Sequence, residues 1–183
     1  ELVAVFGNFI NRVVVLTNKY YSGIVPKPND YSEVDEQTIA ELKAYPAVIA
    51  SSIEKYRFRE AQGELMNLAR LGNKYLADEE PWKLIKTDEK RVKTVMYVAL
   101  QIASALATLS EPFLPFSSAK LQKMLNFTDA ESQLSGKEYS QWDKIATRDS
   151  LLPAGHQIGK AELLFSKIED AQMQQQLDKL EAT

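Results

Sequence analysis

An asparagine and an arginine lie four residues apart in the stretch GNFINR, residues 7–12. If this stretch is helical, the side chains of Asn8 and Arg12 meet on one face of the helix. Together they offer an amide acceptor and several donors for hydrogen bonds to another group. An interhelical hydrogen bond or a salt bridge would use the same two side chains, so the pair indicates either a packing contact or a binding site.

A tryptophan follows a proline in EEPWKLIK, residues 79–86, with acidic residues before it and lysines after it. Pro81 is favoured as the first residue of a helical turn, and it would hold Trp82 at a corner between two helices. An indole at such a corner either packs as a spacer between the helices or offers a flat surface on which a planar group stacks. Both interpretations stay open at this point.

The sequence offers little for catalysis or metal binding. His156, the only histidine, lies in the turn of LLPAGHQIGK, and there is no cysteine to complete a zinc site with it. The seven glycines are scattered and form no phosphate-binding loop. No nucleophile is paired with a base. These observations predict a domain without an active site or a metal centre of its own.

Composition sets the broad class. The 183 residues are 45% hydrophobic and 26% charged, as in ordinary soluble domains. No apolar run reaches 18 residues, so we expect no membrane span, and the lack of cysteine fits a reducing, cytoplasmic compartment. A net charge of −3 argues against coating nucleic acid by bulk charge, but it leaves room for a small local site. The chain opens inside a helical pattern without an initiator methionine, and we expect a piece of a longer protein.

Apolar residues spaced three and four apart predict an all-α bundle of four to five helices. Ser32 and Asp35 have the spacing of a capping box, and Pro46 is expected to kink the helix that follows. We expect the bundle to cover residues 1–126. Residues 127–167 would form an irregular segment that packs on the bundle or on a missing neighbour, and residues 168–183 a polar linker helix.

Four stretches, in order along the chain, resemble one family. The stretch ELVAVFGNFINRVV carries a Gly-Asn-x-x-x-Arg element, and LARLGNKYLADEEPWKLIK carries Asn73, Tyr75, Pro81 and Trp82 in an Asn-x-Tyr-x-x-x-x-x-Pro-Trp pattern. The other two are SEPFLPFSSAKLQKML and WDKIATRDSLLPAGHQIGKAELLFSKIED. Together they resemble the C-terminal anticodon-binding domain of methionyl-tRNA synthetase, a class I aminoacyl-tRNA synthetase. Class I synthetases for isoleucine, leucine, valine and cysteine share the bundle, but this combination points to methionine.

The resemblance implies recognition of the CAU anticodon of methionine tRNA. Asn8, Arg12 and Trp82, with Pro81 holding the tryptophan, match family positions that contact the anticodon, whereas Ala4 replaces a further asparagine of the family. A base stacked on Trp82 would gain affinity whatever its identity. Arg12 could donate to N3 and O2 of cytosine, and Asn8 could accept from its amino group or orient Arg12. Three lysines, Lys19, Lys83 and Lys86, are expected to contact phosphates.

The family's HIGH and KMSKS signatures do not occur in the chain. The resemblance therefore implies that this chain does not itself aminoacylate tRNA. ATP, methionine, magnesium and zinc would belong to a missing catalytic domain of the same protein, and no cofactor is expected here. Two alternatives remain: the anticodon-binding domain of another class I synthetase, or a helical protein–protein interaction module with Trp82 and Arg12 as hot spots.

Overall fold

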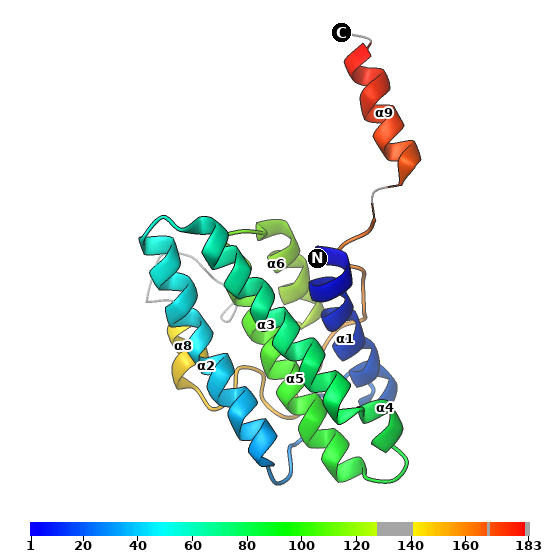
Figure 1. The fold of residues 1–183 in the computed structure, drawn as a ribbon. Coiled ribbons are helices and arrows are strands. Elements are labelled where there is room, and N and C mark those ends of the chain that lie inside the picture. Colours follow the sequence, from blue (N-terminus) through cyan, green and yellow to red (C-terminus); the bar gives the residue numbers. More distant parts are fainter. Residues whose placement is uncertain (128–140, 168, 182–183) are drawn as a thin grey trace.

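The computed structural model describes residues 1–127, 141–167 and 169–181, and all regular secondary structure in these ranges is helical (Figure 1). The expected all-α bundle is thereby confirmed. The described helices are η1 (Leu2–Gly7), α1 (Asn8–Tyr21), α2 (Glu33–Glu54), α3 (Phe58–Glu79), α4 (Pro81–Leu84), α5 (Glu89–Leu109), α6 (Pro115–Met124), α8 (Gln141–Thr147) and α9 (Asp170–Glu181).

Helix α5 is the centre of the bundle. From Val92 to Leu109 nearly every side chain is buried, including Met96, Leu100, Ile102 and Leu106. By length and hydropathy this helix would suffice to cross a membrane, but 94% of that stretch is buried inside the protein. A core helix surrounded by other helices passes the same test, because it is apolar on all sides.

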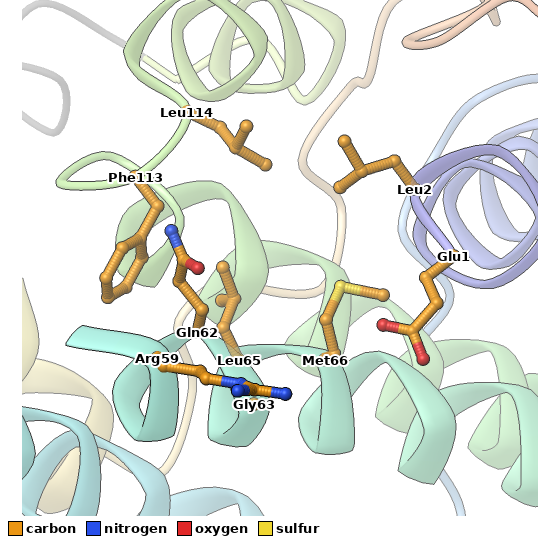
Figure 2. Close-up of a pocket in the computed structure, with 9 residues that line it drawn as sticks. All are labelled: Glu1, Leu2, Arg59, Gln62, Gly63, Leu65, Met66, Phe113 and Leu114. Atoms are coloured by element: carbon orange, nitrogen blue, oxygen red, sulfur yellow. The ribbon is translucent and has the colours of Figure 1, made fainter. Parts of the chain in front are cut away.

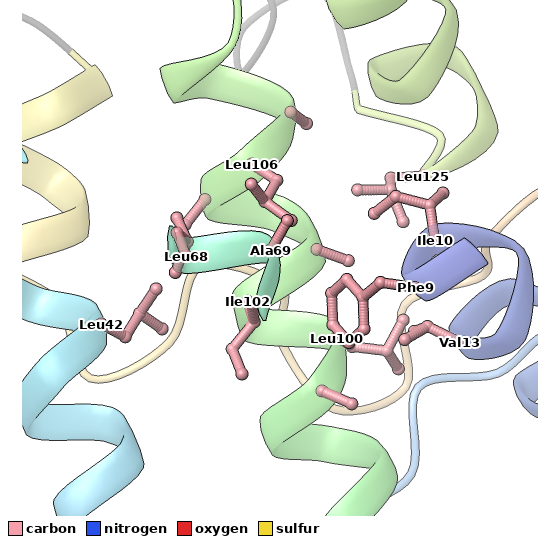
Figure 3. Packing of buried hydrophobic residues seen from close by; sticks show 14 of the residues in the cluster. Phe9, Ile10, Val13, Leu42, Leu68, Ala69, Leu100, Ile102, Leu106 and Leu125 are labelled. Atoms are coloured by element: carbon pink, nitrogen blue, oxygen red, sulfur yellow. The ribbon is translucent and has the colours of Figure 1, made fainter. Parts of the chain in front are cut away.

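Helices α1 and α3 pack closely on α5, with Phe9 at the contact (Figure 3). Gly72 in α3 lies against the ring of Phe9, and a Cβ atom built on Gly72 would come 2.5 Å from that ring. Only glycine therefore lets the two helices approach to this distance. The close approach brings Asn8, next to Phe9, beside Asn73, next to Gly72.

The helix ends follow local sequence signals. The side chain of Ser32 accepts from the backbone of Asp35, and the side chain of Asp35 accepts from the backbone of Ser32, so the expected capping box is present. Helix α2 continues through Pro46. Ser22, in the left-handed conformation at φ 53°, ends α1. One difference from expectation lies at the start, where the first helix opens with a π-helical turn, η1, before α1 begins at Asn8.

The described part of the C-terminal segment lies against the bundle. Gln101 of α5 accepts from the backbone nitrogens of Leu151 and Leu152, at 2.7 and 3.1 Å, and donates to the carbonyl of Leu152. His156 Nε2 lies 2.7 Å from the carbonyl oxygen of Leu125, so this histidine links the segment to the end of α6. Helix α9 then projects away from the bundle (Figure 1). The division of the chain at residues 126 and 167 stays a prediction.

Candidate functional site

The structure brings together two residues that are 70 positions apart in the sequence. The guanidinium carbon of Arg12, on α1, lies over the ring of Trp82, on α4, at 4.6 Å from the ring centroid. Both side chains are half-buried. A guanidinium at this distance is attracted to the π face, typically by about 0.5–1 kcal/mol at exposed sites. One face of the indole is therefore covered by Arg12, so the ring is not simply a spacer enclosed by apolar helices.

The backbone around Pro81 fixes the position of the tryptophan. Glu80 adopts the left-handed conformation at φ 42°, which ends α3 and reverses the chain. The carbonyl of Glu80 accepts from Lys83 at 2.8 Å, and that of Pro81 accepts from Ile85 at 3.1 Å. Pro81 itself is buried. It therefore holds the turn in place, as the sequence suggests, and offers little surface to a ligand.

A buried ion network anchors the same turn to the bundle. The carboxylate of Asp35, fully buried at the start of α2, accepts from the guanidinium of Arg91 and from the hydroxyl of Tyr75 at 2.5 Å. Arg91 also binds Glu79, with 2.9 Å between its Nε and a carboxylate oxygen. Helices α2, α3 and α5 thus meet one residue before the turn that carries Trp82. The network therefore connects the end of α3, just before that turn, to α2 and α5.

The network shifts the ionisation of its members. Burial acts to raise the pKa of Asp35, but hydrogen bonds from Arg91, Tyr75 and Ser32 outweigh it and lower the pKa below its ordinary value. Burial and the hydrogen bond to Asp35 raise the pKa of Tyr75. Asp35 is therefore ionised and Tyr75 neutral at neutral pH. A buried carboxylate with these donors is fully paired, which is the condition for its burial to be tolerated.

Asn8 lies one helical turn before Arg12 and is exposed. Its amide nitrogen donates to Oδ1 of Asn73, on α3, at 3.2 Å. The amide nitrogen of Asn73 in turn donates to the carbonyl oxygens of Val5, at 2.8 Å, and Ala69, at 3.0 Å. The interhelical hydrogen bond expected as one alternative for Asn8 therefore exists. It uses the side-chain nitrogen of Asn8, so the side-chain oxygen, Oδ1, can still accept a hydrogen bond from a ligand.

The three lysines differ in their surroundings, although all are exposed. Lys83 pairs with Glu80 at 2.7 Å. Lys19 lies 5.7 Å from the ring centroid of Tyr20. Lys86 makes no ion pair with any residue in the described ranges. Of these three lysines, Lys83 alone has an ion pair among the described residues.

A hollow of about 410 Å³ lies at the other end of the bundle from α4, where η1, α3 and the start of α6 meet (Figure 2). Leu2, Met66 and Leu114 point into it, and Arg59 lies at its rim. It shares no residue with the site around Trp82. Within the described parts of the chain, no three histidine, aspartate or glutamate side chains are placed to hold a metal ion.

Asn73 and Arg91 are the two important residues that sequence reasoning did not assign to the site. Asn73 lies in the stretch that carries the family resemblance, but an asparagine in mid-helix gives no sign of its partner. Arg91 is one of several charged residues at the start of α5. Only its distance from the buried Asp35 distinguishes it, and that distance follows from tertiary packing.

The described helices have the same fold as part of a solved methionyl-tRNA synthetase. The structure superposes on Mycobacterium tuberculosis methionyl-tRNA synthetase in complex with methionyl-adenylate with a TM-score of 0.80, over 91% of this chain and 31% of that chain, at 20% sequence identity. The apo form of the same enzyme also gives a TM-score of 0.80. At this identity the likeness establishes the fold alone.

Sequence comparison establishes the family. Residues 25–183 match the family described as the anticodon binding domain of methionyl tRNA ligase. The chain is 78% identical over its whole length to a methionine–tRNA ligase of Christiangramia forsetii and 63% identical to one of Flavobacterium johnsoniae, and it covers 26% and 28% of these proteins. The chain belongs to the family of methionyl-tRNA ligase anticodon-binding domains. It spans about a quarter of the length of the curated relatives it matches.

Proposed function

We propose that this chain binds the CAU anticodon loop of methionine tRNA on the surface formed by Asn8, Arg12 and Trp82. The observation that carries the proposal is the position of Arg12 over the Trp82 ring, at 4.6 Å, on the same helix face as Asn8. Sequence-specific RNA recognition takes unstacked loop bases onto aromatic planes and binds their edges through hydrogen bonds. An indole, a guanidinium and an amide side by side supply both kinds of contact.

Stacking supplies the affinity. In the free chain Arg12 covers one face of the indole. We propose that the first anticodon base takes this place on the ring, and that Arg12 turns to the edge of the base. A base stacked on an aromatic side chain contributes roughly 1–3 kcal/mol, and a partly exposed cation–π contact about 0.5–1 kcal/mol. The exchange is therefore favourable even before Arg12 makes new hydrogen bonds.

Hydrogen bonds supply the discrimination. Cytosine presents N3 and O2 as acceptors and an amino group as donor, whereas uracil presents N3–H and O4. Arg12 donates to the acceptors of cytosine, and the carbonyl oxygen of Asn8 accepts from its amino group. With uracil, Arg12 would keep O2 as an acceptor but face the N3–H donor, and the side-chain carbonyl oxygen of Asn8 would face O4, another acceptor. Each polar group left unpaired in a desolvated contact costs about 1–3 kcal/mol.

The protein to which this chain belongs is proposed to be a methionine–tRNA ligase that acts in the cytoplasm with ATP, methionine and magnesium. Those ligands, and zinc where the catalytic domain carries it, would bind outside this chain. The chain covers 26% of the length of its Christiangramia forsetii relative, which leaves room for a catalytic domain. We propose that the C-terminal segment, residues 127–167, and the polar helix after it connect anticodon binding to that domain.

Binding of RNA stem-loops tests the proposal. A labelled CAU stem-loop should bind saturably, and a UAU stem-loop should bind roughly 10-fold or more weakly, the factor that corresponds to 1.4 kcal/mol. Trp82→Ala should weaken both loops. Trp142→Phe, a change to the other tryptophan, is the matched control and should weaken neither.

Two results would favour the alternatives. Tighter binding of an isoleucine, leucine, valine or cysteine anticodon loop would indicate another class I synthetase. Absence of salt-dependent RNA binding by the folded chain would contradict an RNA site and favour a protein–protein module, since phosphate contacts weaken steeply with salt.

A further inference from the structure

We propose that Asn73 is a positioning residue that sets the orientation of the Asn8 amide and thereby the preference for cytosine. This inference rests on the proposed function and deepens it. Asn73 would not contact the RNA. It would act through Asn8, which is exposed on the opposite helix.

The orientation of the Asn73 amide is fixed by its surroundings. Its nitrogen donates to the carbonyl oxygens of Val5, at 2.8 Å, and Ala69, at 3.0 Å. An amide nitrogen carries two hydrogens, so both are used. Rotation of the amide by 180° would place its oxygen against these two carbonyl oxygens and replace two hydrogen bonds with two repulsive contacts. Oδ1 of Asn73 must therefore point toward Asn8.

The fixed oxygen of Asn73 then determines what Asn8 presents. Asn8 meets an acceptor and so turns its own nitrogen to it, at 3.2 Å. The side-chain oxygen of Asn8, Oδ1, then faces a ligand. An exposed asparagine without such a partner can turn either group outward, because its amide offers both an acceptor and a donor. With Asn73 present, Asn8 acts as an acceptor, which suits the amino group of cytosine and not O4 of uracil.

The packing of α1 on α3 maintains this arrangement. Gly72 precedes Asn73 and lies against the ring of Phe9, which follows Asn8. The absence of a side chain at Gly72 lets the helices approach closely enough for the two asparagine amides to meet. Asn73 is half-buried at this contact, and solvent competes less for its hydrogen bonds.

The test compares Asn73→Ala with Asn67→Ala in the 183-residue chain. Asn67 is on the same helix, and among the described residues its side chain bonds to neighbours on α3, Glu64 and Arg70. Affinities for CAU and UAU stem-loops would be measured for each variant. The preference is the dissociation constant for the UAU loop divided by that for the CAU loop. For Asn73→Ala we expect this ratio to fall by about 5-fold or more, partly through tighter binding of UAU. Asn67→Ala should keep the wild-type ratio.

A structural role alone would give a different result. If Asn73 only holds the helices together, its removal weakens both loops equally and leaves the ratio unchanged, which would overturn the inference. Asn73→Leu keeps the branched shape and the number of heavy atoms of the side chain, and it serves in place of the alanine variant if that variant unfolds. In an Asn8→Ala background, Asn73→Ala should change the ratio no further; a further fall would show that Asn73 does not act through Asn8.

The same data separate this inference from the proposed function. If the wild-type chain fails to bind CAU or binds both loops equally, the proposed function is wrong and the inference falls with it. If the wild type prefers CAU and Asn73→Ala keeps that preference, only the inference is wrong.

Discussion

Arg12 has two tasks in the proposed site, and they depend on different properties of its side chain. Its charge attracts the indole and the RNA, whereas its planar fork of donors can bind two acceptors of one base at once. Lysine keeps the charge but lacks the fork. The two tasks can therefore be separated by a conservative substitution.

Arg12→Lys should reduce the preference for CAU over UAU stem-loops by about 5-fold or more, because one donor group of lysine cannot pair with N3 and O2 together. The salt dependence of binding should stay the same, because the charge is retained. Titrations of both loops at several salt concentrations measure both quantities. An unchanged preference would show that Arg12 does not read the base.

Sequence alone predicts part of this site. Asn8 and Arg12 are suggested by their spacing, and Trp82 by its place after Pro81. The ion pair between Lys83 and Glu80, and the contact between Asn8 and Asn73, could not be predicted, because each depends on side-chain geometry. The RNA-binding roles of these residues stay predictions.

At the level of helices, the buried network of Asp35, Arg91, Glu79 and Tyr75 joins three elements next to the Trp82 turn. Removal of one member of a buried ion pair typically costs 3–5 kcal/mol, because the partner charge is left without compensation. The network should therefore contribute to stability in a way that depends on the ionisation of Asp35.

The pKa of Asp35 is lower in the folded chain than its ordinary value of 3.8. A lowered folded pKa means that the stabilisation is fully present above about pH 4 and is lost as the pH falls through the folded value. Urea unfolding should show the wild type more stable than Asp35→Asn by about 3 kcal/mol at pH 7. The difference should narrow at pH 3 and below. A constant difference in unfolding free energy across this pH range would contradict a lowered pKa of Asp35 in the folded chain.

Gly72→Ala tests the close approach of α1 and α3. Alanine favours a helix over glycine by about 1 kcal/mol, but here its Cβ would lie 2.5 Å from the Phe9 ring. Overpacking of this kind typically costs 1–3 kcal/mol, so we expect net destabilisation. Gly63, on the same helix with open space around it, is the matched control, and Gly63→Ala should stabilise the chain in the same unfolding measurement.

Most helices could be predicted from apolar spacing and from their ends. Ser32 with Asp35 starts α2, and Pro81 starts α4. The π-helical turn before Asn8 was not predicted, because no local signal distinguishes it from an ordinary helical turn. The path of residues 151–158 also could not be predicted, since it depends on capture by Gln101, some 50 positions away.

At the level of the whole molecule, a net charge of −3 must be reconciled with the proposed binding of RNA. A small site resolves the conflict if only its rim is basic, because charges beyond a Debye length of about 10 Å are largely screened. Lys86 is exposed and makes no ion pair in the described parts of the chain, whereas Lys83 is paired with Glu80. The two lysines should therefore contribute unequally.

Lys86→Gln should make the negative slope of log affinity against log salt shallower by about 0.7, the value for one phosphate contact to single-stranded nucleic acid. It should weaken CAU and UAU loops alike, because a phosphate contact carries no sequence information. Lys83→Gln should change the slope less. If neither lysine alters the slope, the RNA backbone does not pass over α4.

The central claim is that a base stacks on Trp82, and the fluorescence of that side chain tests it most directly. Trp142→Phe leaves Trp82 as the only one of the chain's two tryptophans. Titration of this variant with a CAU stem-loop should quench the emission saturably, and a UAU stem-loop should need roughly 10-fold or more RNA to reach the same quenching. If the CAU loop binds the folded chain without changing Trp82 emission, the base does not stack on this ring and the account is contradicted.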